Sequence, residues 1–269
     1  LAACGEPERE WPEPAPALWE IASPEGQRGW LFGTIHSLPA GVEWRTPVLD
    51  DALADAGTVV VEIAELGDAN KAAGTFNRYS RGTGLPPLSE RVAPEDRADL
   101  AAFLERADAD DGDFAELDTW AAALVLANRA REVETGQNID RALIDAGGEV
   151  VGLESFVLQY ALFDALPPEE QADLLMALAR DSGNEVGRIE AWLTGDLAAL
   201  EASSQGLLSD PELRQALQTA RNRRWAPVVA ELIDEGRRPF VAVGTGHLFG
   251  EQSLPALLAE RGYTVRRIQ

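Results

Sequence analysis

The two histidines of this 269-residue chain, His36 and His247, occupy the same local context. Each follows an apolar run typical of a β-strand, and each is preceded by Gly-Thr-x, so the order strand, glycine, threonine, histidine occurs twice. A glycine three residues before the histidine permits a tight turn or the close approach of a ligand. One buried histidine is more often structural than functional. Both histidines in one repeated context indicate a shared chemical site.

Two glutamates complement the histidines. Glu62 ends a Val-Val-Val run and Glu154 ends a second apolar run, positions where an ionised carboxylate is costly unless it meets a cation or hydrogen-bond donors. Two imidazoles with one or two carboxylates suit Zn²⁺, Mn²⁺ or Co²⁺. Such an ion would acidify a bound water, with a spare carboxylate as general base. We therefore expect His36, His247, Glu62 and Glu154 to bind a divalent metal.

The glutamates have an alternative explanation that the sequence leaves open. Either carboxylate could pair with a buried arginine, for which Arg221 and Arg129 are the candidates, because structural ion pairs bury carboxylates just as active sites do. Arg221 opens the one basic cluster of the chain, residues 221–225, and it or Asn222 could instead steady an oxyanion.

Less specific signals come from two other segments. Asp140 stands at the start of a predicted helix, where either it or Asn138 could cap the N-terminus. The acidic run at residues 108–113 has the look of a calcium loop but lacks the glutamate at the twelfth position, which favours a solvated turn.

The elements around these residues predict an α/β fold with a central mixed or mostly parallel sheet flanked by helices. A hairpin is expected over residues 18–32 and a helix over 46–56. Further strands are expected at 58–63, 149–154, 239–243 and 263–268, and helices at 221–235 and 253–261. Strands alternating with helices favour parallel pairing, and catalytic groups of parallel sheets gather at the carboxyl ends of the strands.

Two long Ala-rich segments, at about 65–134 and 165–220, are predicted to be helical insertions that form a cap over the sheet within one domain spanning residues 18–269. The acidic character of the cap predicts a preference for basic or neutral peptides. The sequence indicates no oligomeric state.

Composition limits the location and the partners. A net charge of −23 makes nucleic acid a poor partner. The single cysteine, Cys4, excludes an internal disulfide, and Leu-Ala-Ala-Cys resembles a bacterial lipobox. We therefore expect lipidation at Cys4, an extracytoplasmic position on a bacterial membrane with the lipid as the only membrane contact, and a Pro- and Glu-rich tether up to residue 17. A stray cysteine in a flexible tail is the alternative.

The segments carrying this chemistry resemble the TraB/GumN family, which includes the PrgY pheromone-shutdown proteins and the animal TIKI proteins. The segments that carry the resemblance are residues 30–36, 59–63, 136–140, 151–154, 221–225 and 243–250. The resemblance implies an active site of two Gly-x-x-His motifs and a glutamate, and, for the TIKI branch, a divalent-metal-dependent peptidase. A wider similarity to erythromycin-esterase-like hydrolases implies an α/β core with paired histidines.

Carried over by position, the resemblance points first to His36, Glu62 and His247. Glu154, Asp140, Arg221 and Asn222 match further positions, with Asp140 and Arg221 as substrate-binding residues. The resulting hypothesis is a metal-dependent hydrolase acting on a peptide or protein. Two alternatives stay open: a module that sequesters a peptide without cleaving it, and a metal-free esterase with histidine as general base and glutamate as its partner.

Overall fold

The computed structural model describes residues 9–35, 37–146 and 148–269, so Cys4 and His36 lie outside the described residues. The central sheet has six strands in the order β6-β4-β7-β2-β1-β8. Strands β6, β4, β7 and β2 pair in parallel, whereas β1 is antiparallel to both β2 and β8. The prediction of a mixed, mostly parallel sheet is confirmed. The strands are β1 Leu18–Ala22, β2 Arg28–Thr34, β4 Thr58–Ile63, β6 Glu149–Glu154, β7 Pro239–Gly244 and β8 Thr264–Arg267.

The central strands are buried on both faces, which explains their continuous apolar sequences. Side chains alternate between the faces along each strand. Trp30 and Phe32 of β2 pack on one face with Trp192, and Leu31 packs on the opposite face with Trp225. The first face is covered by α1 (Pro47–Asp55), α5 (Ile139–Asp145), α8 (Glu185–Leu193) and α9 (Leu197–Ser203), and the second by α12 (Ala220–Asp234) and α13 (Leu254–Glu260).

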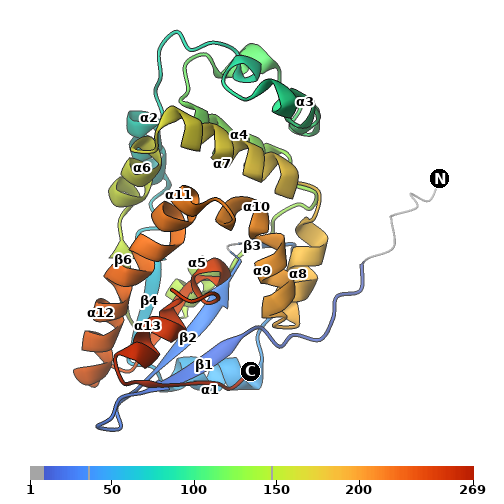
Figure 1. Ribbon diagram of the computed structural model, residues 1–269. Coiled ribbons are helices and arrows are strands. Elements are labelled where there is room, and N and C mark those ends of the chain that lie inside the picture. The colour runs from blue at the N-terminus through green and yellow to red at the C-terminus, as the bar shows by residue number, and fades with distance from the viewer. Residues whose placement is uncertain (1–8, 36, 147) are drawn as a thin grey trace, which may run out of the picture.

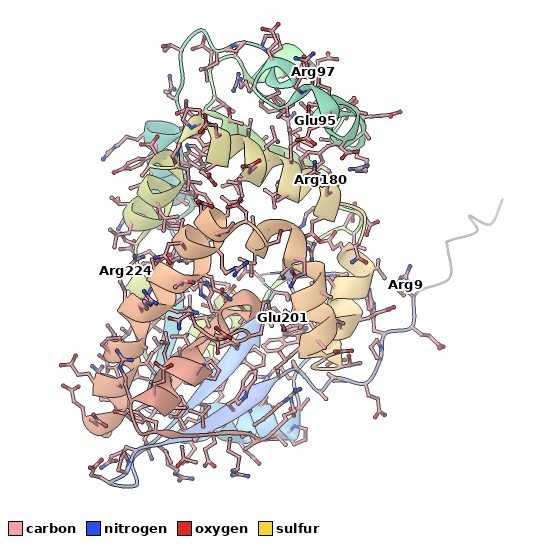
Figure 2. The ribbon with its side chains drawn as sticks, in the orientation of Figure 1. Arg9, Glu95, Arg97, Arg180, Glu201 and Arg224 are labelled. Atoms are coloured by element: carbon pink, nitrogen blue, oxygen red, sulfur yellow. The ribbon has the colours of Figure 1, made fainter. Side chains whose placement is uncertain are left out.

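A helical lobe lies beyond the carboxyl ends of the parallel strands (Figure 1). It has its own apolar core, centred on Phe103, Trp120 and Leu175. Its helices are α2 Ala69–Tyr79, α3 Arg97–Arg106, α4 Thr119–Arg129, α6 Phe156–Asp164, α7 Pro168–Asp181, α10 Gln205–Leu208 and α11 Pro211–Arg214. Arg180 on α7 pairs with Asp96 and Asp99 at the start of α3, and Figure 2 shows its side chain in this lobe. The lobe therefore covers the edge of the sheet where the predicted site residues end their strands.

Two local features were not predicted. A two-stranded ribbon pairs β3 (Ser37–Leu38) with β5 (Gln137–Asn138), and a π-helical turn, Gln215–Thr219, precedes α12. Two-residue strands have no periodicity to detect, and a π turn has no residue preference that separates it from an α-helix. The acidic run 108–113 forms a short 3₁₀ turn in which Asp110 and Asp113 cap each other, in agreement with the solvated-turn interpretation.

Within the described residues, no helix combines the length and the apolar character needed to cross a bilayer.

Candidate functional site at the carboxyl edge of the sheet

The two Gly-Thr-x-His elements lie side by side at the ends of neighbouring parallel strands. Thr34 of β2 is in register with Gly244 of β7, and the Thr245 hydroxyl donates to the Thr34 carbonyl at 2.9 Å. Gly33 favours this close approach, because a Cβ at this position would lie 3.0 Å from Thr245 Oγ1 and 3.1 Å from Leu248 Cδ1. The glycine of the first element thus allows close packing between the two elements. His36, which follows this packed segment, lies outside the described residues.

Both predicted glutamates end strands at the same edge. Glu62 is the penultimate residue of β4 and Glu154 the last of β6, next to it in the sheet. The Gly244 N–H donates to Glu62 Oε1 at 2.7 Å, which ties this carboxylate to the end of β7. Their side chains are only 11% and 3% exposed. Neither glutamate is therefore an ordinary surface carboxylate.

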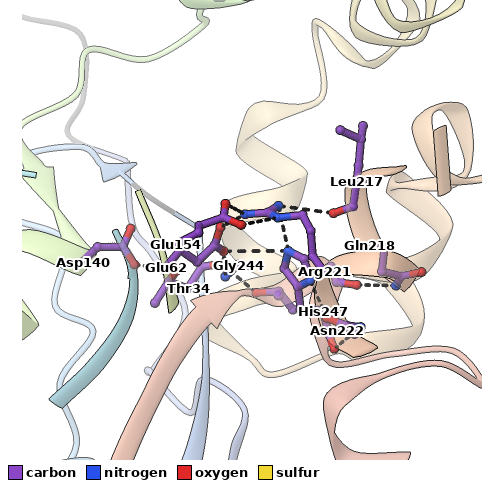
Figure 3. Close-up of polar contacts among 12 residues, drawn as sticks. Thr34, Glu62, Asp140, Glu154, Leu217, Gln218, Arg221, Asn222, Gly244 and His247 are labelled. Atoms are coloured by element: carbon purple, nitrogen blue, oxygen red, sulfur yellow. Dashed lines mark hydrogen bonds and ion pairs between the residues drawn. The ribbon is translucent and has the colours of Figure 1, made fainter. Parts of the chain in front are cut away.

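Arg221, from the first turn of α12, joins the two carboxylates (Figure 3). Its Nη2 donates to Glu62 Oε2 and to Glu154 Oε1, both at 2.5 Å, and its Nε donates to Glu154 Oε2 at 3.2 Å. Its Nη1 reaches the Leu217 carbonyl and His247 Nε2, each at 3.2 Å. These contacts use all five guanidinium donors. The ion pair that the sequence left open is formed by Arg221.

Burial and charge act against each other in this cluster. Burial by itself lowers the pKa of Arg221, but the attraction of Glu62 and Glu154 outweighs it and holds that pKa above its ordinary value. Burial raises the pKa of Glu154, and the Arg221 guanidinium opposes the rise only in part. One guanidinium faces two carboxylates, so the three groups carry a net charge of −1 when both carboxylates are ionised.

His247 lies 6% exposed in the 3₁₀ turn Thr245–His247 that follows β7. Its Nε2 is 3.9 Å from Glu62 Oε1, and its Nδ1 is 2.6 Å from Asn222 Oδ1. The Trp225 ring packs against the imidazole with centroids 4.6 Å apart and lies under the Arg221 guanidinium at 4.5 Å. One face of α12 therefore supplies Arg221, Asn222 and Trp225 to the imidazole.

Asp140 reaches the same edge from α5, which lies on the face of the sheet opposite α12. It is buried in the first turn of α5 and accepts a hydrogen bond from the Thr34 hydroxyl at 2.9 Å. The N-cap is Asn138, whose Oδ1 accepts from the Arg141 N–H at 2.7 Å. Of the two capping candidates, the structure thus selects Asn138 and leaves the Asp140 carboxylate for contacts at the strand end.

Sequence reasoning missed Gln218. Its Nε2 donates to the carbonyls of Gly246 and Phe249, on either side of His247, and so anchors the loop that carries the imidazole. A glutamine in an Ala-rich helical segment gives no signal of such a role. The role of Trp192 was not predicted either. Its Nε1 donates to the Gly33 carbonyl at 2.7 Å and fixes the end of β2.

The metal prediction can be tested against the donor atoms. Among the described residues, the one group offering three histidine, cysteine or carboxylate atoms within 4.8 Å is Glu170, Asp210 and Glu212 in the helical lobe. At the strand edge, His247 Nε2 and Glu62 Oε1 form a two-atom set. Two ligands at about 2.1 Å from an ion lie up to about 4.2 Å apart, so the 3.9 Å spacing is compatible with a shared ion. Glu154 is instead engaged at two points by Arg221.

A cavity of about 730 Å³ lies beside the β3–β5 ribbon, at the ends of α4, α7 and α8. It is lined by Ser37 and Asn138, which neighbour His36 and Asp140 in the chain, and by residues including Arg131, Leu178 and Arg188. Glu62, Arg221 and His247 are not among its lining residues. The cavity therefore lies next to the β3–β5 ribbon, which follows β2 in the chain.

Comparison with known proteins yields one family. The family model described as TraB/PrgY/gumN family matches residues 17–267, nearly the whole chain and all the strand-end residues described above. No curated protein and no solved structure matches. The chain belongs to the TraB/PrgY/gumN family.

Proposed function

We propose that the chain is a metal-dependent hydrolase that cleaves peptide bonds at the carboxyl edge of the sheet. The observation that carries the proposal is the juxtaposition of His247 Nε2 with Glu62 Oε1, 3.9 Å apart, in a buried cluster with a net negative charge. An imidazole whose other nitrogen is held by a hydrogen-bond partner is the usual arrangement of a metal-ligating histidine. The residual charge of the cluster favours a divalent cation.

His247 and Glu62 would hold the ion, with His36 as the third ligand. Bound there, Mn²⁺, Co²⁺ or Zn²⁺ would acidify a water and polarise the substrate carbonyl. Glu154 is the proposed proton acceptor, because burial raises its pKa toward the range in which a carboxylate is an effective base. Asp140 and the adjoining 730 Å³ cavity are proposed to receive the flanking part of a peptide.

Arg221 has a narrower role than the sequence predicts. All five of its donors are engaged, so it contacts a substrate oxyanion only after releasing one. The donor most easily released is Nη1, because its two contacts, each at 3.2 Å, go to uncharged groups, whereas Nε at 3.2 Å and Nη2 at 2.5 Å donate to carboxylates. Asn222 is also fully engaged, through Oδ1 and Nδ2.

The test combines metal analysis with peptide turnover. We expect the purified chain to retain a divalent ion by mass spectrometry, and to cleave a peptide mixture with a rate that chelator abolishes and added metal restores. His247→Ala and His36→Ala should lose both properties. Glu212→Gln is the matched control, because it disrupts the acidic group of the helical lobe and leaves the strand edge unchanged.

Three results would each contradict the proposal. If the histidine variants bind metal and cleave peptides as well as the parent, these residues are not the site. If ester hydrolysis persists in chelator, the metal-free hydrolase with His247 as general base is favoured. If peptides bind saturably without product, the chain is a sequestering module.

Lipidation at Cys4 and an extracytoplasmic location stay predictions, tested by mass spectrometry of the N-terminal peptide of the mature protein.

A further inference from the structure

Asn222 is the residue that binds the far side of the His247 imidazole. It is fully buried on α12, and its Oδ1 lies 2.6 Å from His247 Nδ1. It follows Arg221 directly and is separated from the reactive edge by the imidazole ring itself (Figure 3). Its position therefore allows it to act on the imidazole without contacting a substrate.

The orientation of the Asn222 amide is fixed by its other contacts. Its Nδ2 donates to two backbone carbonyls, that of Gln252 at 2.8 Å and that of His247 at 3.3 Å. Carbonyls only accept, so the amide nitrogen must face them and the amide oxygen must face the imidazole. Asn222 Oδ1 can only accept, so His247 Nδ1 must carry the proton.

The other side of the ring agrees with this assignment. Arg221 Nη1, which can only donate, faces His247 Nε2 at 3.2 Å, so Nε2 presents its lone pair. Trp225 packs on the ring at 4.6 Å and opposes rotation about the Cβ–Cγ bond. A neutral imidazole in water favours the opposite tautomer, with the proton on Nε2. The site therefore reverses the intrinsic preference.

We propose that Asn222 is a positioning residue that selects the Nδ1–H tautomer of His247 and so keeps the lone pair on Nε2, the ring nitrogen that faces Arg221 and lies nearest Glu62. The inference rests on the proposed function only for the reason why this tautomer is useful to the protein. A metal ligand and a general base both need that lone pair, and the tautomer itself can be measured without metal or substrate. It also replaces the expectation that Asn222 steadies an oxyanion, because both ends of its amide are engaged.

The experiment is ¹⁵N–¹H correlation of the imidazole rings in the full chain, with and without chelator. The chain has two histidines, so a His36→Gln variant assigns every ring signal. At about pH 9, where an ordinary imidazole is neutral, we expect His247 in the parent to be almost entirely the Nδ1–H tautomer. In Asn222→Leu the buried Nδ1–H loses its acceptor, whereas Arg221 Nη1 still faces Nε2 and by itself favours the same tautomer. The Nδ1–H fraction should therefore fall clearly below that of the parent.

Gln218→Leu is the matched control. Gln218 donates to the carbonyls of Gly246 and Phe249, so its loss loosens the same loop without touching the ring, and the tautomer should stay Nδ1–H. Asn222→Asp keeps the acceptor and should also keep Nδ1–H, which provides a second reading if Asn222→Leu does not fold. The inference is wrong if Asn222→Leu retains the Nδ1–H fraction of the parent, if Asn222→Asp loses it, or if Gln218→Leu loses it equally. Inactivity of the parent toward peptides would contradict the proposed function but would leave the inference about the His247 tautomer unaffected.

Discussion

Replacing Arg221 with methionine is predicted to be among the most destabilising single changes in the molecule. The side chain is 10% exposed and neutralises Glu62 and Glu154, which are 11% and 3% exposed. Methionine fills a similar volume over Trp225 but provides no donor. The variant thus tests the charge and hydrogen bonds of the guanidinium rather than its packing.

The magnitude follows from the burial of the cluster. Removing one partner of a buried ion pair costs about 3–5 kcal/mol, since the remaining charge is left without compensation. Arg221→Lys keeps the charge but loses the fork that spans both carboxylates, and should cost about 1.5–3 kcal/mol. Arg223→Met on the exposed side of the same helix, where the guanidinium donates to the Gln252 side-chain oxygen, should change stability by less than about 0.5 kcal/mol.

The pH dependence gives a second, independent check. Removal of the guanidinium takes away the interaction that opposes the effect of burial, so the pKa of Glu154 rises further. A folded-state pKa above the unfolded one means stability that is present at low pH and is lost as the pH rises. The deficit of Arg221→Met relative to the parent should therefore be largest at neutral to alkaline pH and shrink as the pH falls through the raised pKa.

The assay is urea unfolding followed by tryptophan fluorescence and circular dichroism, with parent and variants compared at each pH. Comparison at matched pH cancels the titration of the remaining acidic surface. A deficit below about 1 kcal/mol at neutral pH, or one that grows toward acid, would refute the reasoning that Arg221 compensates two buried carboxylates.

The remaining predictions concern the strand ends. Gly33→Ala should cost about 1–3 kcal/mol in thermal or urea unfolding, because its Cβ would meet Thr245 Oγ1 at 3.0 Å. Gly246→Ala, where a Cβ meets nothing within 4 Å, should stay within about 1 kcal/mol of the parent; equal losses would discount the packing argument. Glu154→Gln removes a carboxyl whose pKa is raised by burial, so its stability relative to the parent should improve as the pH rises through the range in which that carboxyl ionises. A relative stability that instead declines with rising pH would show that Arg221 outweighs burial.

Much of the fold was predictable because its signals are local. The runs at 58–63 and 239–243 are apolar and β-branched because those strands are buried on both faces, and helices separate them. Parallel pairing then brings Glu62, Glu154 and the Gly-Thr elements to one edge whatever the order of the strands. The order itself was not predictable, since β7 inserts between β2 and β4 from a distant part of the chain.

The chemistry of the cluster depended on contacts between distant residues. Sequence offered Arg221 and Arg129 equally as partners for the glutamates, and it could not tell whether Asn222 contacts a substrate or the imidazole. The direction of α12 decides both questions, because it places Arg221 over the carboxylates and Asn222 behind the ring. The π turn before α12 also brings Gln218 to the His247 loop, a contact that cannot be predicted from a glutamine in a helical segment.

By itself, the sequence determined the class of fold, the family and the residue types available at the strand ends, because hydrophobic periodicity and short motifs are properties of neighbouring residues. Only the tertiary structure decided which of those residues touch. The hydrogen bonds and ion pairs of the site depend on atoms brought within about 3 Å from segments up to 211 residues apart. That spacing is set by the pairing of β2 with β7 and the packing of α12 against the sheet, which no local pattern encodes.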